Sequence, residues 1–122
     1  MNTAITMLGS NFNATENIEL AIEKLSEHFE LISQSTILIS KPVGEKYKAD
    51  FHNIALKLSS DETALETKSI FKEIENELGR TPESKQLGII PIDIDLVFWN
   101  ENLIHPDYDR FDFVRKCIDE IF

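Results

Sequence analysis

The segment 91–99, which reads Pro-Ile-Asp-Ile-Asp-Leu-Val-Phe-Trp, constrains the fold of this chain more than any other segment. Successive side chains of a β-strand point to opposite faces of a sheet, so alternating apolar and acidic residues predict a strand with one buried face. Asp93 and Asp95 would then lie side by side on the opposite, polar face. The side chains expected to enter the core are Ile92, Ile94, Leu96 and Phe98.

Two carboxylates held this close repel each other, and a cation between them relieves the repulsion. Carboxylates on a rigid strand suit Mg2+, which also binds phosphate oxygens, so Asp93 and Asp95 are candidate metal ligands. The alternative is a half-buried strand whose acidic face only contacts water. The pattern by itself leaves both interpretations open.

Length and composition narrow the class of protein. The 122 residues, 42% of them apolar, predict a single domain over residues 1–122 with a substantial core. A formal net charge of -10 argues against a non-specific binder of nucleic acid or of anionic membranes. Cys117 is the only cysteine, which excludes an internal disulfide and a cysteine-based zinc site. No basic leader and no apolar run of membrane-spanning length is found, so we expect a cytoplasmic protein.

The spacing of apolar residues predicts an alternation of strands and helices. Strands are expected over residues 3–8, 31–39, 51–58 and 91–99. Helices are expected over residues 14–28, from Ser60 or Asp61 to Leu78, and from about residue 111 onward. Asn13 and Glu16 are typical of a capping box that begins the first helix. Residues 80–88 are expected to form a polar loop, and a turn at residues 100–102 precedes a very short strand.

This order predicts an α+β fold, the ferredoxin-like βαββαβ arrangement. Its antiparallel sheet carries both helices on one face, and a C-terminal helix follows. The other face is expected to be free, and it would carry Asp93, Asp95 and Asn53. Many unrelated activities use this arrangement, so the fold alone does not predict the function.

The chain resembles the 6-hydroxymethyl-7,8-dihydropterin pyrophosphokinase family over nearly its whole length. No single motif is decisive, and the resemblance rests on several motifs that occur in the same order with matching spacing. They are Gly9-Ser10-Asn11, Pro42-Val43-Gly44 with Asp50-Phe51-His52-Asn53, Glu75 with Leu78-Gly79-Arg80, Gly88 with Asp93-Ile94-Asp95-Leu96, and Phe113-Val114 with Glu120-Ile121.

The resemblance implies transfer of a pyrophosphoryl group from ATP to the pterin hydroxymethyl group, which leaves AMP. It implies that Asp93 and Asp95 bind two Mg2+ ions, which bridge ATP and the attacking hydroxyl and stabilise developing charge. Arg80 is assigned to the catalytic set together with these two aspartates. The partners implied are ATP and a pterin, and the sequence leaves the oligomeric state unknown.

The same resemblance assigns two groups of binding residues. The pterin side would consist of Ser40, Val43, Phe51, Asn53 and Phe113, with the Asn53 amide at the pterin edge and the Phe113 ring stacked on it. The nucleotide side would consist of Lys72, Glu75, His105 and Arg110. Five of these residues also have an ordinary structural interpretation: an exposed polar residue for Asn53, core packing for Phe113, a solvated helix face for Lys72 and Glu75, and a loop position for His105.

Three positions depart from the family pattern. Ile90 and Pro82 stand where the family has arginines, and Leu87 stands where it has an aromatic ring against the pterin. Arg110 matches a further arginine only out of register. An arginine supplies a bidentate, permanently charged phosphate contact. Loss of one contact of this kind in a transition state costs about 3 to 4 kcal/mol.

Three hypotheses therefore remain open at the level of the sequence. The first is a compact, divergent pterin pyrophosphokinase that uses ATP and Mg2+. The second is a catalytically impaired relative that binds a pterin or a nucleotide. The third is an acidic interaction module, which would have no reason to keep Asp93 and Asp95 together on one face.

Overall fold

The computed structural model describes residues 1–42, 47 and 49–122. Its strands are β1 (Asn2–Ser10), β2 (Glu30–Gln34), β3 (Leu38–Ser40), β4 (Phe51–Ser60), β5 (Asp93–Trp99) and β6 (Asn102–Leu103). Its helices are α1 (Ala14–His28), α2 (Ala64–Glu77), α3 (Pro82–Gln86), α4 (Asp107–Arg110) and α5 (Asp112–Asp119).

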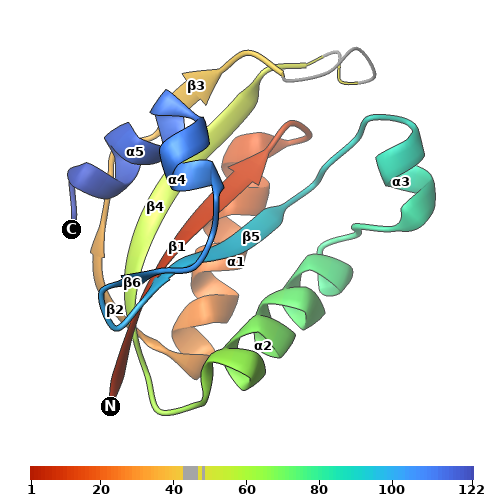
Figure 1. Cartoon of the computed structure of the whole chain (residues 1–122). Coiled ribbons are helices and arrows are strands. Elements are labelled where there is room, and N and C mark those ends of the chain that lie inside the picture. The colour runs from red at the N-terminus through yellow and green to blue at the C-terminus, as the bar shows by residue number, and fades with distance from the viewer. Residues whose placement is uncertain (43–46, 48) are drawn as a thin grey trace.

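The strands form one antiparallel sheet with β1 at its centre (Figure 1). The order across the sheet is β2-β4-β1-β5-β6, and β3 pairs with the first residues of β4. The predicted order of strand, helix, strand, strand, helix, strand is confirmed, and with it the ferredoxin-like α+β class. None of the helices in the described part of the chain is long and apolar enough to span a membrane.

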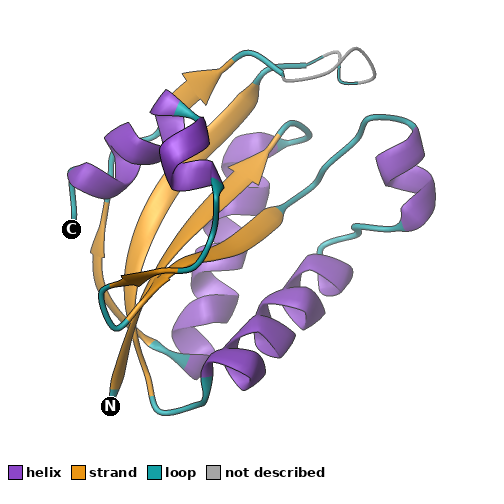
Figure 2. Cartoon of the chain, viewed as in Figure 1, coloured by secondary structure: helices purple, strands orange, loops and turns teal. Residues whose placement is uncertain are grey.

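Helices cover the sheet on both sides (Figure 2). Helices α1 and α2 lie on one face, where they bury the main core with side chains that include Leu8, Ile18, Leu56, Phe71 and Ile94. Helix α5 lies on the other face, and its buried residues Val114, Cys117 and Ile118 pack against Met7, Ala55 and Val97 of the sheet. The prediction that this second face is free is therefore wrong, because the C-terminal helix folds back onto it.

The predicted strand over residues 31–39 is two strands, β2 and β3, which both pair with β4. Ser35 lies between them and is buried, and its hydroxyl accepts a hydrogen bond from the Ala55 amide at 2.9 Å. Thr36 is held by Glu120, whose Oε1 accepts from the Thr36 amide at 2.8 Å. At this break the Ser35 amide still donates to Ala55 O at 2.9 Å, and the other bonds come from side chains. The apolar alternation does not reveal the break.

Strand β5 departs from simple alternation near its end. Ile92, Ile94 and Leu96 enter the main core as predicted, whereas Phe98 packs in the second core with Val97. The pairing with β1 shifts here, because Ile5 lies opposite Phe98 while the next residue, Thr6, lies opposite Leu96. The extra residue in β5 forms a bulge, which reverses the direction of the side chains after it. The predicted direction of Phe98 is therefore wrong.

The expected helix starts also need correction. Asn13 precedes α1 with a left-handed backbone (φ 43°), and its side chain makes no capping hydrogen bond. Helix α2 is capped by Thr63, not by Ser60 or Asp61, and the Thr63 hydroxyl accepts from the Glu66 amide at 3.1 Å. The polar segment 80–88, expected to be a loop, contains α3, which has its own capping box at Thr81 and a proline in its first turn.

Replacement of Thr63 by alanine is expected to lower the free energy of unfolding by about 1 kcal/mol, because it removes the acceptor for the Glu66 amide. Urea denaturation of the two proteins measures the difference. Thr63→Ser keeps the hydroxyl and should differ little from the original chain. Equal midpoints for all three proteins would contradict the assigned cap.

Candidate active site

A cavity of about 260 Å³ opens on the second face of the sheet, between β1, β4 and β5 and the chain around α4 and α5. The pairing of the three strands explains which side chains meet there. Gly9 of β1 lies opposite Asn53 of β4 on one side and opposite Asp93 of β5 on the other. Because Gly9 has no side chain, the floor of the cavity stays open between these two polar residues.

Most of the residues that the sequence singles out come together around this cavity. Those that line it are Ser40, Phe51, Asn53, Arg80, Asp93, Asp95, His105 and Phe113. Val43 lies outside the described residues. Three others do not line it, namely Lys72, Glu75 and Arg110. Their assignment to nucleotide binding stays a prediction.

Arg80 balances part of the acidic charge on β5. Its Nη1 donates to Asp93 Oδ1 at 2.7 Å and to Glu75 Oε2 at 3.0 Å. Burial alone would lower the pKa of Arg80, but the hydrogen bond and the charge of Asp93 outweigh this and raise it. Arg80 therefore stays a cation that ties the end of α2 to β5.

Glu75 supports this arrangement from beneath the cavity. Its side chain is almost fully buried, and its Oε2 accepts from the Ile94 amide at 2.7 Å as well as from Arg80. Burial raises the pKa of Glu75, while the Ile94 amide and the Arg80 charge act in the opposite direction. Lys72 lies 3.3 Å from Glu75 Oε1, but its side chain is largely exposed. Glu75 thus does not line the cavity itself, and it acts on the cavity by binding Arg80, which does.

Asp95 has no such basic partner and is the most perturbed group of the site. Burial is the main cause that raises the pKa of Asp95 to about 8, followed by the negative charge of Asp93 and the hydrogen bond between the two carboxyl groups. Glu75 and Asp107 add smaller effects in the same direction. The protein therefore holds Asp95 where its ionised form needs a nearby cation.

His105 and Asp107 approach Asp95 from the segment that begins α4. His105 Nε2 lies 3.9 Å from Asp95 Oδ1, and His105 Nδ1 lies 3.7 Å from Asp107 Oδ2. The Asp107 amide donates to His105 Nδ1 at 3.2 Å, which orients the ring. All three side chains are about 30% exposed, so they are accessible from the cavity.

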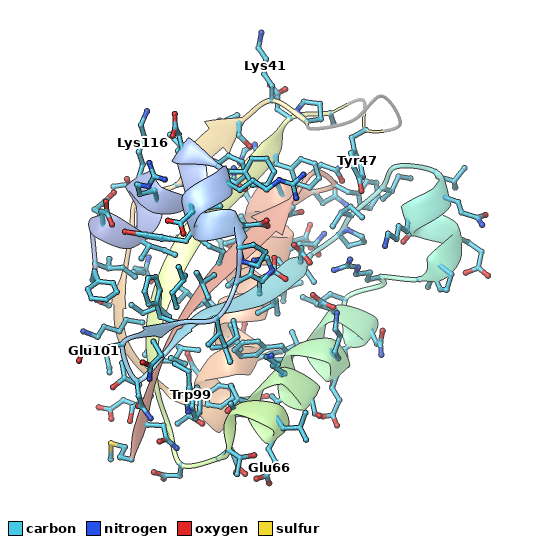
Figure 3. All side chains as sticks on the ribbon, in the orientation of Figure 1. Lys41, Tyr47, Glu66, Trp99, Glu101 and Lys116 are labelled. Carbon is cyan, nitrogen blue, oxygen red and sulfur yellow. The ribbon has the colours of Figure 1, made fainter. Side chains whose placement is uncertain are left out.

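Aromatic rings make up the opposite side of the cavity. Phe111 and Phe113 stack with their centroids 5.5 Å apart, and Tyr47 contacts Phe51 edge to face, also at 5.5 Å. In Figure 3, Tyr47 turns toward the body of the molecule, whereas Lys41 extends outward beyond the end of β3. A flat, apolar ring would find aromatic partners here.

The amide of Asn53 is oriented by its own protein. Its Nδ2 donates to Leu38 O and to Ser40 Oγ, both at 2.9 Å. These bonds connect β4 to β3. They occupy the N–H groups of Asn53 Nδ2, so the side chain is left with Oδ1 as an acceptor for a ligand. Asn53 is buried, and its Oδ1 lies near Gly9, on the floor of the cavity.

The sequence did not indicate several residues as part of the site, although they line the cavity. They are Met7, Lys41, Tyr47, Asp107 and Phe111. Asp107 begins α4, which has only four residues and is too short to show an apolar period, and Phe111 precedes the first residue of α5. Two of the three departures from the family pattern lie away from the cavity: Pro82 begins α3, and Leu87 is largely exposed. The third, Ile90, is buried in the cavity wall.

The donor set of the site fits a divalent metal ion. Asp93 and Asp95 present carboxylate oxygens on one face of a strand, at a position where their mutual repulsion is relieved only in part by Arg80. Hard oxygen ligands of this kind suit Mg2+.

Comparisons with known proteins agree on one family. The family model described as 7,8-dihydro-6-hydroxymethylpterin-pyrophosphokinase matches residues 5–122. The chain is 30% identical to a 2-amino-4-hydroxy-6-hydroxymethyldihydropteridine pyrophosphokinase from Haemophilus influenzae, over 89% of this chain and 73% of that protein. It is 33% identical to the protein of the same name from Bacillus subtilis, over 98% of this chain and 78% of that protein.

A solved structure has a similar fold. A crystal structure of Plasmodium falciparum HPPK-DHPS superposes with a TM-score of 0.59 and 16% sequence identity, covering 98% of this chain. This chain spans 33% of that longer protein. The likeness supports the same arrangement of sheet and helices.

Asp95 is expected to make stability depend on pH. Its pKa of about 8 in the folded chain exceeds the ordinary value of 3.8, so the folded state binds more protons between these values. The free energy of unfolding should therefore fall as pH rises from about 4 to about 8, by up to about 1.4 kcal/mol per pH unit from this group.

The measurement is urea denaturation at several pH values in the presence of a chelator. Asp95→Asn should flatten the decline, and Asp109→Asn, at an exposed position in α4, should leave it unchanged. Parallel curves for Asp95→Asn and the original chain would contradict the raised pKa.

Proposed function

The chain belongs to the 7,8-dihydro-6-hydroxymethylpterin-pyrophosphokinase family, and we propose that its cavity transfers a pyrophosphoryl group from ATP to 6-hydroxymethyl-7,8-dihydropterin with the help of Mg2+. The family activity is a step of folate biosynthesis. The observation that carries the proposal is the meeting of Asp93 and Asp95 with Asn53 and an aromatic wall in one cavity. The proposal includes one domain over residues 1–122 and action in the cytoplasm.

The reaction needs two substrates held in line. The pterin hydroxyl gives up its proton to solvent as its oxygen forms a bond to the β-phosphorus of ATP, the bond from that phosphorus to the oxygen of AMP breaks, and AMP leaves. Catalysis then depends on positioning and on stabilisation of negative charge. When bound, Mg2+ ions supply positive charge next to the phosphate oxygens and the attacking hydroxyl. Asp93 and Asp95 would hold them.

The pterin would lie on the aromatic side of the cavity. Phe113, supported by the stacked ring of Phe111, offers a flat surface for it. Asn53 would accept a hydrogen bond from the pterin edge through Oδ1, since its Nδ2 is already bound to Leu38 O and Ser40 Oγ. Ser40 and Phe51 would complete this side.

The triphosphate would lie toward β5 and the segment before α4. His105 lines this part of the cavity and would donate to a phosphate oxygen. Arg80 would support the phosphates while Glu75 keeps its guanidinium in place. Lys72 and Arg110 would reach the nucleotide from exposed positions outside the cavity.

One observation favours an impaired relative as a second candidate. Ile90 contributes an apolar side chain to the cavity wall at the position of a family arginine, and Pro82 begins an exposed helix turn at the position of another. Among the described residues that line the cavity, three carboxylates face two permanently charged basic side chains, Arg80 and the exposed Lys41, and the imidazole of His105. This balance disfavours an anionic triphosphate unless metal ions accompany it.

The first experiment measures AMP formed from ATP, Mg2+ and 6-hydroxymethyl-7,8-dihydropterin. We expect AMP formation that depends on the pterin and falls at least about 100-fold in Asp93→Asn/Asp95→Asn, because the metal ligands are lost. Asp61→Asn/Asp112→Asn changes the charge equally at exposed positions and should keep the activity. A folded protein that forms no pterin-dependent AMP would favour the impaired relative.

A second experiment tests the pterin side by calorimetry. Phe113→Leu should weaken pterin binding by about 3-fold to 10-fold, because a ring contact contributes about 0.5 to 1.5 kcal/mol beyond buried area. Phe122→Leu, at an exposed residue that does not line the cavity, is the matched control. The same affinity in both variants would show that the pterin does not contact Phe113.

A further inference from the structure

The carboxylate of Glu120, at the end of α5, is bonded to the break between β2 and β3. Its Oε1 accepts from the Thr36 amide at 2.8 Å, and its Oε2 accepts from the Thr36 hydroxyl at 3.0 Å. A carboxylate that receives both donors of one residue forms charge-assisted bonds in a defined direction. This pair of bonds, called here the Glu120 clasp, lies outside the cavity and joins residues 84 positions apart in the chain.

The segment that contains Thr36 leads into β3, and β3 orients the amide of Asn53. Leu38 O and Ser40 Oγ both accept from Asn53 Nδ2 at 2.9 Å. Leu38 also packs against the second core, to which α5 contributes its buried side chains. The clasp therefore attaches α5 to the same strand that fixes the polar side of the cavity.

Helix α5 carries the aromatic wall of the cavity, which consists of Phe111 and Phe113. Phe113 lies in its first turn and stacks on Phe111, which directly precedes the helix. The helix has only eight residues, of which Val114, Cys117 and Ile118 are buried. A helix this short is not stable by itself, so its place on the sheet depends on its contacts. In Figure 1, α5 lies against the sheet close to β3.

Two other hydrogen bonds near the end of α5 do not reach β3. Tyr108 Oη donates to Asp119 Oδ1 at 2.5 Å, and both residues belong to the C-terminal segment. Lys57 Nζ donates to Phe122 O at 3.2 Å, which ties the last residue to β4. Loss of the Glu120 clasp is therefore expected to let α5 shift relative to β3 while the two cores stay folded.

We infer that Glu120 is a positioning residue: through its bonds to Thr36 it holds the aromatic wall at a fixed distance from β3, and it thereby sets the affinity for the flat substrate. A flat ring stacks well only on a ring that is held at one spacing. Phe113 belongs to α5 and Asn53 is oriented by β3, so the clasp fixes the two sides of the pterin site relative to each other. The effect on affinity rests on the proposed function, whereas the effect on α5 does not.

The position of α5 can be followed through Cys117, the only cysteine of the chain. Its side chain is 2% exposed, and burial raises the pKa of its thiol, so Cys117 reacts slowly with a thiol reagent while α5 is in place. In Glu120→Ala the modification of Cys117 under native conditions should be at least about 10-fold faster, because the charge-assisted bonds are lost. Glu19→Ala removes the same charge from an exposed position in α1 and should react as the original chain does.

Two further variants test the partner and the geometry of the clasp. Glu120→Gln keeps an oxygen that accepts from the Thr36 amide, so its rate should stay within about 3-fold of the original. Thr36→Val removes the hydroxyl and keeps the amide, so it should accelerate modification less than Glu120→Ala does. Added to Glu120→Ala, Thr36→Val should have little further effect, because both changes remove the same bond.

Calorimetry separates positioning from a general loss of stability. In Glu120→Ala the affinity for 6-hydroxymethyl-7,8-dihydropterin should fall at least about 3-fold more than the affinity for ATP with Mg2+, because chains with a displaced wall do not bind the pterin. Saturating pterin should in turn slow the modification of Cys117 in the original chain, since it binds only while the wall is in place.

Equal rates of Cys117 modification in Glu120→Ala and Glu19→Ala would overturn the inference. Faster modification with equal losses of pterin and ATP affinity would overturn it as well, because Glu120 would then act on stability alone. An original chain that binds no pterin would reject the proposed function and with it the effect on affinity. The modification rates would still decide whether Glu120 positions α5.

Discussion

The pairing of β1 with β4 on one side and β5 on the other is the constraint on which the candidate site depends. It places Gly9 between Asn53 and Asp93, and Met7 between Ala55 and Asp95. The polar groups that would recognise a pterin and those that would hold metal therefore share one face of adjacent strands. A shift of one residue in either pairing would send one of the two groups into the main core.

The acidic charge on β5 gives the site its electrostatic character. Arg80 and the buried Glu75 hold Asp93 in a bonded network, while Asp95 is left with a raised pKa and a histidine as its nearest basic partner. One carboxylate is thus compensated within the protein, and the other requires a proton or a metal ion.

The C-terminal helix turns a flat sheet face into a cavity. Helix α5 packs Val114, Cys117 and Ile118 against the sheet, and the chain that leads into it brings Phe111, Phe113, His105 and Asp107 to the edge of the acidic pair. An open face could bind a partner, as the interaction-module hypothesis supposed. A face bordered by aromatic rings and carboxylates is better suited to a small, flat and anionic pair of ligands.

The sequence by itself determined the element order, the class of fold, the direction of Asp93 and Asp95 and, through collinear motifs, the family. The first three follow from short-range periodicity, which the chain carries locally, and the family follows from the order and spacing of its motifs. Only the tertiary structure decided the bulge that turned Phe98, the break at Ser35, the covered second face and the approach of Asp107 to Asp95. Each of these depends on contacts between residues far apart in the chain, and such contacts leave no periodic pattern in the sequence.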